Sequence, residues 1–192
     1  MQSREDIFRL ISELQQDIEL LDEVCEQNSK AVRRVESGAI DDLDYAALGY
    51  TIHNLYSLLE NYALRVAKTF ENDLDRDTWH RDLVKRMTIE IATIRPAVWD
   101  RGLARHIDEL RRFRHAFRHV YDSSLDPEKL MIAQKHVEPA AEGVRVAHLL
   151  LLEKLTLMAS KLKWLNYYEV ARDTRPHPGN SPPKKDVLEI GQ

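Results

Sequence analysis

Apolar residues recur every three or four positions through most of the chain, a period that predicts amphipathic helices. The first apolar stripe covers residues 3–35, and a second covers residues 43–70 after Asp41 or Asp42 as the N-cap. Ser3 and Asp6 have the spacing of a capping box, and Gly38 follows the first stripe as a helix-ending residue. Two long helices joined by so short a turn are expected to form an antiparallel hairpin.

Three further helical segments follow, at residues 77–94, 96–121 and 127–165. Pro96 ends the first of them, because proline interrupts a helix at the preceding residue. Asp126-Pro127 begins the last, and Pro139 is expected to divide it into a short helix and a long one. No stretch alternates with the two-residue period of a strand. The predicted fold class is therefore all-α, an antiparallel multi-helix bundle.

Residues 1–170 are expected to form one helical domain, and residues 171–192 a flexible tail. The tail is rich in proline, has few apolar residues and lacks a helical period. A disordered terminus without a specific function is the simpler interpretation. The alternative is a short docking segment that ends in Val187, Leu188 and Ile190.

Composition narrows the class of protein further. Hydrophobic residues make up 43% and charged residues 31% of the 192 positions, and the formal net charge is −4, as in an ordinary globular domain. Cys25 is the single cysteine, which excludes an internal disulfide and a cysteine-based zinc site and favours a reducing cytoplasm. We expect no secretory signal, and the apolar cluster at 146–152 is shorter than the roughly 20 residues that span a membrane. The slight acidity restricts any nucleic-acid contact to a local basic patch.

Residues 109–121 form such a patch, because basic and aromatic residues are interleaved there on one predicted helix. At 100° per residue, two adjacent polar ridges carry Arg111, His115 and His119, and Arg114, Arg118 and Tyr121. Guanidinium groups suit phosphate oxygens, and imidazole transfers protons near neutral pH. Attack of a ribose 2′-OH on its phosphate needs a base, an acid and positive charge, and it needs no metal. The alternative, which is common for such helices, is a solvated face that forms salt bridges with its neighbours.

Residues 114–121, Arg-His-Ala-Phe-Arg-His-Val-Tyr, resemble the R-x4-H-x-Y motif of HEPN ribonucleases, in particular the HepT-like toxins of prokaryotic toxin–antitoxin modules. Residues 53–60, 79–83 and 95–96 resemble further passages of this family. The resemblance covers about residues 40–135. It implies an all-helical domain that forms a homodimer, in which the motif helices of two chains face one cleft.

In the families that the chain resembles, the motif arginine and histidine are the catalytic pair, which implies these roles for Arg114 and His119. Arg114 would hold and neutralise the scissile phosphate, and His119 would transfer protons, with two copies dividing the acid and base roles. The family commonly has asparagine where this chain has His115, and both catalytic assistance and phosphate orientation stay open for this residue. His115, Arg118 and Arg111 are the expected auxiliary RNA-binding residues.

The resemblance also implies a means of inhibition. In HepT-like systems the motif tyrosine, here Tyr121, is the residue to which a minimal nucleotidyltransferase antitoxin attaches AMP, and the added nucleotide would repel and occlude RNA. Glu60 is expected to pair with Arg114 or Arg118, as an ordinary salt bridge or to orient a catalytic arginine. The predicted function is a metal-independent endoribonuclease toxin that uses no cofactor. The alternative is a non-catalytic HEPN module that binds a nucleotidyltransferase or a nucleotide.

Overall fold

The computed structural model describes residues 3–38, 41–71, 79–118 and 125–173. Within these ranges the extended regular elements are all α-helices, which confirms the predicted all-α bundle. They are α1 Arg4–Glu36, α2 Asp42–Phe70, α3 Trp79–Met87, α4 Arg101–Phe117, α5 Pro127–Gln134 and α6 Val137–Asp173. Residues 171–173, which were expected to begin the tail, belong to α6. The rest of the expected tail, residues 174–192, lies outside the described residues.

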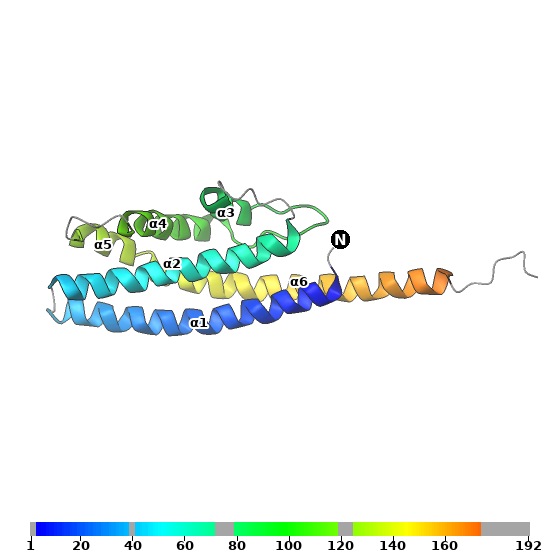
Figure 1. Ribbon diagram of the computed structural model, residues 1–192, viewed down its shortest axis with the longest axis horizontal. Coiled ribbons are helices and arrows are strands. Elements are labelled where there is room, and N and C mark those ends of the chain that lie inside the picture. Colours follow the sequence, from blue (N-terminus) through cyan, green and yellow to red (C-terminus); the bar gives the residue numbers. More distant parts are fainter. Residues whose placement is uncertain (1–2, 39–40, 72–78, 119–124, 174–192) are drawn as a thin grey trace, which may run out of the picture.

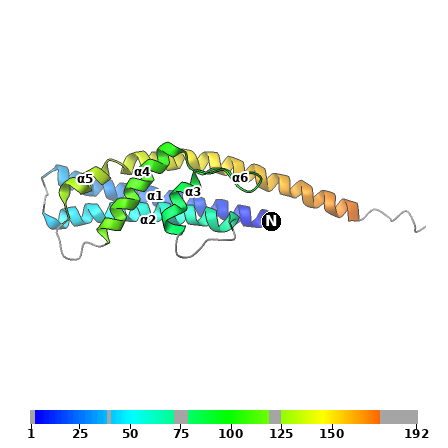
Figure 2. The ribbon, with the colours of Figure 1, turned by 90° about the horizontal axis from the view of Figure 1, so that it is seen from above.

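The helices form two layers. The long helices α1, α2 and α6 lie side by side, with α1 antiparallel to the other two, and α3, α4 and α5 cover α2 (Figure 1). Seen from above, α4 crosses the long helices obliquely between α5 and α3 (Figure 2), and it packs on both α2 and α6. The end of α6, drawn in orange, runs on beyond the other helices.

The ends of α1 and the starts of α2 and α5 lie where the local sequence predicts them, and side chains satisfy the backbone N–H groups at the three starts. The Asp6 N–H donates to Ser3 Oγ at 3.1 Å and the Ser3 N–H donates to Asp6 Oδ2 at 3.1 Å, which confirms the capping box of α1. Gly38 has a φ of 96°, a conformation that favours glycine, directly after α1. Asp41 caps α2 and Asp126 caps α5.

The helix predicted over residues 77–94 is wrong in its second half, because α3 ends at Met87 and a loop leads on to α4. The Arg95 side chain is 1% exposed and donates to Glu71 Oε1 through Nε at 2.9 Å and through Nη2 at 2.6 Å. Its guanidinium also donates to backbone carbonyl oxygens of α3 and of the loop. These bonds fold the loop around the guanidinium, so Ile94 does not continue the apolar face and is 46% exposed.

Two later boundaries also differ from the prediction. α4 begins at Arg101 rather than at Pro96, because Asp100 Oδ1 accepts a first-turn backbone N–H at 2.7 Å and caps the helix there. α5 and α6 separate at residues 135–136 rather than at Pro139. Pro139 fits inside the first turn of α6, where backbone N–H groups need no partner within the helix.

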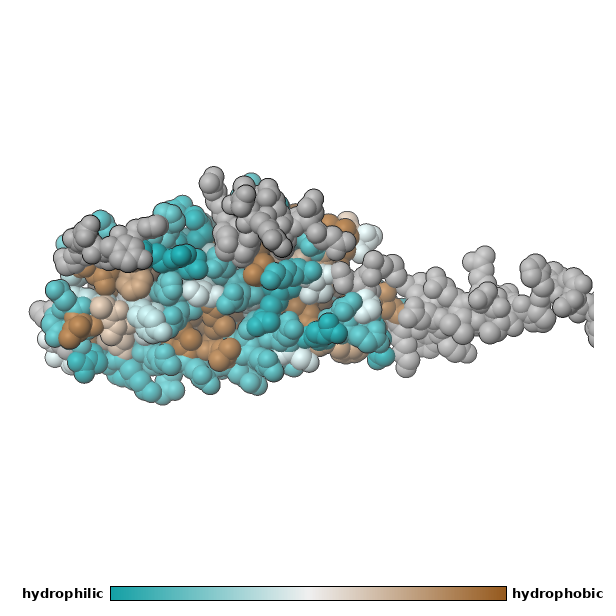
Figure 3. Space-filling model, viewed as in Figure 1, coloured by the Kyte–Doolittle hydropathy of each residue, from teal (hydrophilic) through white to brown (hydrophobic). Residues whose placement is uncertain are grey.

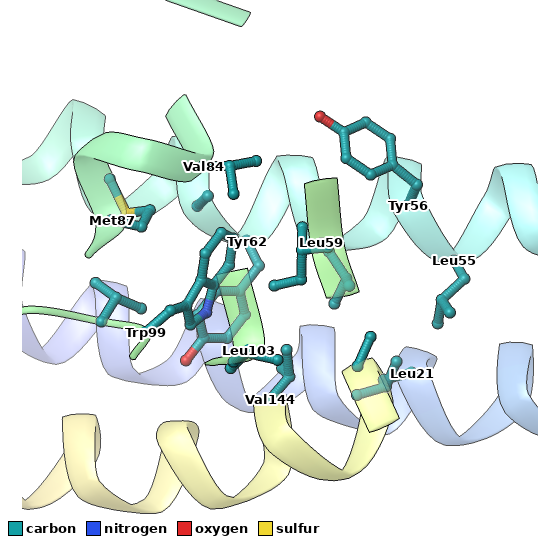
Figure 4. Packing of buried hydrophobic residues seen from close by; sticks show 14 of the residues in the cluster. Leu21, Leu55, Tyr56, Leu59, Tyr62, Val84, Met87, Trp99, Leu103 and Val144 are labelled. Atoms are coloured by element: carbon teal, nitrogen blue, oxygen red, sulfur yellow. The ribbon is translucent and has the colours of Figure 1, made fainter. Parts of the chain in front are cut away.

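The core lies where α2 meets the helices on either side of it. Buried side chains from α1, α2, α3, α4, α6 and the loop before α4 meet there (Figure 4): Leu21, Leu55, Leu59, Tyr62, Val84, Met87, Trp99, Leu103 and Val144. Leu43 lies in the first turn of α2, at the end of the bundle, and is 79% exposed. On the face in Figure 3, apolar patches are separated by broad hydrophilic areas.

Candidate functional site

The last turn of α4 packs against α2 through Phe117. A Cβ atom at Gly49 would lie 2.7 Å from Phe117 Cε2, so glycine leaves the room that the ring needs at this point of α2. The Phe117 ring centroid lies 5.7 Å from that of His53, one turn further along α2, and 5.6 Å from that of Phe113. This packing fixes the C-terminal end of α4 on α2.

Arg114 lies one turn before Phe117 and reaches the same face of α2. Its Nη2 lies 3.2 Å from Glu60 Oε2, and its guanidinium carbon lies 5.4 Å from the ring centroid of Tyr56. The side chain of Glu60 is 7% exposed, and that of Arg114 is 22% exposed. The Tyr56 hydroxyl donates to Glu60 Oε1 at 3.4 Å. Of the two pairings predicted for Glu60, the structure therefore contains the one with Arg114, whose guanidinium stays partly open to solvent.

Gly49, His53, Tyr56 and Glu60 of α2 and Arg114 and Phe117 of α4 form one cluster. Burial and charge control the protonation of its tyrosine and its histidine. Burial raises the pKa of Tyr56, and the neighbouring Glu60 carboxylate raises it further, so the phenol stays protonated and acts as a donor. Burial lowers the pKa of His53 from 6.5, and the positive charges of Arg114 and Arg118 lower it further. The His53 imidazole is therefore neutral at pH 7.

Two polar atoms of this cluster are buried without a hydrogen-bond partner among the described residues, namely Arg114 Nε and His53 Nδ1. Most buried polar atoms in proteins are paired with protein or water. The guanidinium and the imidazole thus both keep hydrogen-bonding capacity that the described residues do not use.

The other predicted site residues lie around this cluster or outside the described ranges. Arg111 Nε donates to Asp108 Oδ1 at 2.7 Å, so it is already held by its own helix. Arg118 is the exposed C-cap residue of α4, and His115 is exposed one turn before the end of that helix. His119 and Tyr121 lie outside the described residues, and their roles stay predictions.

On α2, three residues of this cluster were not predicted as site residues: Gly49, His53 and Tyr56. With Glu60 they follow one another at intervals of three or four along α2, which places all four on one helix face. That spacing was available in the sequence. The sequence does not show which helix packs on this face of α2, because only tertiary packing brings the end of α4 there.

Within the described ranges, no three histidine, cysteine, aspartate or glutamate side chains are grouped so as to hold a metal ion. Nor is any described helix both long and apolar enough to cross a membrane.

These features define a class of protein, an all-helical bundle in which an arginine- and histidine-rich helix holds a guanidinium against a neighbouring helix. A family model described as HepT-like protein matches residues 47–150, more than half of the chain and a segment that contains the whole cluster. The chain belongs to the HepT-like family, as its sequence predicted. No curated protein and no solved structure matches the chain.

Proposed function

We propose that this HepT-like protein is a metal-independent endoribonuclease, the toxin of a toxin–antitoxin module, and that it acts in the cytoplasm as a homodimer. Arg114 binds and neutralises the scissile phosphate, and His119 transfers protons. The ribose 2′-OH loses its proton and attacks phosphorus, the bond to the 5′-oxygen breaks, and that oxygen takes up a proton. The products are a 2′,3′-cyclic phosphate and a 5′-hydroxyl end.

The position of Arg114 is the observation that supports this proposal. Its guanidinium contacts both the Tyr56 ring and the Glu60 carboxylate, and the side chain is only partly exposed to solvent. A charge held in place before the substrate arrives needs little reorganisation during the reaction. Glu60 is therefore a positioning residue in this proposal, and Arg118 and His115 add RNA contacts at the same end of α4.

Inhibition is the second part of the proposal. A minimal nucleotidyltransferase antitoxin attaches AMP to Tyr121, which follows the proposed proton-transfer residue His119 by two positions. The added phosphate and nucleoside repel and occlude the RNA phosphate at Arg114. Intact-mass measurement after co-expression with a cognate nucleotidyltransferase should show one added adenylate, absent from Tyr121→Phe. Neutralised toxicity without that added mass would contradict this mechanism.

The cleavage experiment compares the wild type with Arg114→Ala, Arg114→Lys and His119→Ala on RNA in EDTA. Arg33→Ala, an exposed arginine on α1 with no ion pair to a described residue, is the control. We expect cyclic-phosphate ends from the wild type and the control, and a strong loss of cleavage in both alanine variants. Arg114→Lys keeps the charge but loses the planar pair of donors, so it should retain only part of the activity. A wild type that binds a nucleotidyltransferase but cuts RNA no faster than the alanine variants would favour the non-catalytic module instead.

A further inference from the structure

A second group of basic residues, from α3 and α4, lies nearer to the N-terminus of α4 than Arg114 does. It surrounds a hollow of about 900 Å³ between the end of α3, the exposed face of α4 and the junction of α5 with α6. α3 and α5 flank α4 on opposite sides at this level (Figure 2). The basic side chains that line the hollow are Lys85, Arg101, Arg105 and Arg112.

The positive charge of this hollow exceeds the negative charge that it contains. Its two carboxylates, Asp108 and Glu109, are both bound by arginines of their own helix: Arg111 and Arg112 lie 2.7 and 3.1 Å from Asp108, and Arg112 lies 2.9 Å from Glu109. The other three cations of the hollow form no ion pair with a described carboxylate: Lys85, Arg101 and Arg105. Three cations are therefore left for a ligand.

A histidine pair holds one wall of the hollow in place. His106 on α4 and His136 at the α5–α6 junction share a hydrogen bond between their Nδ1 atoms, which lie 2.9 Å apart, and their ring centroids are 5.2 Å apart. The bond joins α4 to a segment 30 residues away in sequence. Because this bond holds α4 against the α5–α6 junction, the arginines of α4 that line the hollow are presented from a fixed backbone.

Basic residues of α4 outside the hollow lie between it and Arg114. At 100° per residue, Arg101 and Arg114 lie about 140° apart around the helix axis, and Arg111 and Arg118 lie between them. At 1.5 Å per residue, Arg101 and Arg114 are separated by roughly 20 Å along the axis. A few nucleotides of an extended strand cover this distance.

We propose that the hollow binds backbone phosphates of an RNA strand to one side of the scissile bond, through Lys85, Arg101 and Arg105. The inference rests on the proposed function for the direction of the strand, since Arg114 is the point where the strand is cut. Lysine and arginine bind phosphate oxygens without regard to base sequence, and each contact releases condensed counterions. The hollow therefore supplies affinity and register, and it leaves the choice of sequence to other groups.

The test measures binding separately from cleavage. A fluorescent 2′-O-methyl RNA of roughly a dozen nucleotides cannot be cut by 2′-OH attack, and its dissociation constant is measured by anisotropy from 50 to 200 mM KCl. The variant is Lys85→Gln/Arg101→Gln/Arg105→Gln. The control, Arg33→Gln/Lys68→Gln/Lys161→Gln, removes three exposed cations of α1, α2 and α6 that form no ion pair with a described residue, so both proteins lose the same net charge.

We expect the variant of the hollow to lower the slope of log affinity against log salt by about 2, since each phosphate contact to a single strand contributes about 0.7. Its affinity at 50 mM KCl should fall at least tenfold, whereas the control should keep a slope near that of the wild type. Equal changes in both proteins, or no change in either, would overturn the inference. Cleavage of unmodified RNA by the wild type, assayed in parallel, tests the proposed function on its own. Binding of RNA through the hollow without cleavage would support this inference and contradict the proposed function.

Discussion

Gly49 controls how closely α4 approaches α2, and its replacement by alanine tests whether that approach matters for function. The new Cβ would lie 2.7 Å from Phe117 Cε2, whereas carbon atoms pack at about 3.5–4.0 Å, so the ring must move by roughly 1 Å. The ring is held by His53 and Phe113, which limits where it can go. We therefore expect the last turn of α4, with Arg114 one turn before Phe117, to shift.

The change in stability should be small, because two effects oppose each other. Alanine stabilises a helix interior by about 1 kcal/mol relative to glycine, and overpacking costs about 1–3 kcal/mol. The net loss is then about 0–2 kcal/mol, or a fall in Tm of at most about 8 °C for a chain of this size. The effect on cleavage should be larger, since a displacement of about 1 Å at a catalytic group can reduce the rate by about 100-fold.

Gly143→Ala is the matched control for Gly49→Ala. Its Cβ would lie 2.7 Å from Leu103 Cδ1, an equally close approach between α6 and α4 that lies away from Arg114. Tm by circular dichroism and initial rates of RNA cleavage are measured for both variants. We expect similar or smaller losses of Tm in the control, and loss of cleavage in Gly49→Ala alone. If the two variants cut RNA equally well, the contact of Phe117 with α2 does not position Arg114.

Three further substitutions test single contacts. Glu60→Gln should lower the free energy of unfolding by about 1–3 kcal/mol, because it removes the charge opposite a half-buried guanidinium; urea unfolding that matches the wild type would contradict this. Arg95→Met should lower the free energy of unfolding by about 3–5 kcal/mol, because it leaves the Glu71 carboxylate without this ion pair and removes the hydrogen bonds that hold the loop. Urea unfolding of this variant measures the loss. Burial lowers the pKa of His148, so folding favours the neutral imidazole. This contribution to the free energy of unfolding is fully present above pH 6.5, the ordinary pKa of histidine, and is lost as the pH falls below that value. Tm measured from pH 7.5 down to 5 should therefore fall less in His148→Gln than in the wild type, and identical curves would rule out this contribution.

The helices α1 and α2 and their ends could be predicted from the sequence because the signals are local. The capping box at Ser3 and the glycine at 38 lie within a few residues of the boundaries that they set. The end of α3 could not be predicted in this way. It depends on the bond between Arg95 and Glu71, whose positions differ by 24 in sequence, and an apolar period that continues to residue 94 gives no sign of it.

The candidate site shows the same division between local and tertiary information. The sequence placed Arg114 on a polar ridge and offered two arginines as partners of Glu60. Helical geometry alone cannot choose between them, because Arg114 and Arg118 are four positions apart on one face. The choice of Arg114 follows from the packing of Phe117 against Gly49, which sets the distance between α4 and α2. Gly49, His53 and Tyr56 were not predicted as site residues for this reason, although their spacing on α2 is regular.

The Glu60–Arg114 pair stands at the border between core and solvent, and this position decides what it contributes. A buried ion pair is weak evidence for stability, since removing two charges from water costs about as much as their attraction returns. An exposed pair would contribute little for the opposite reason, because water screens it. What the pair supplies at the border is a fixed direction for a guanidinium that a ligand can still reach. Apolar residues of similar volume at both positions would therefore give a bundle about as stable as the wild type, with no oriented charge at the end of α4.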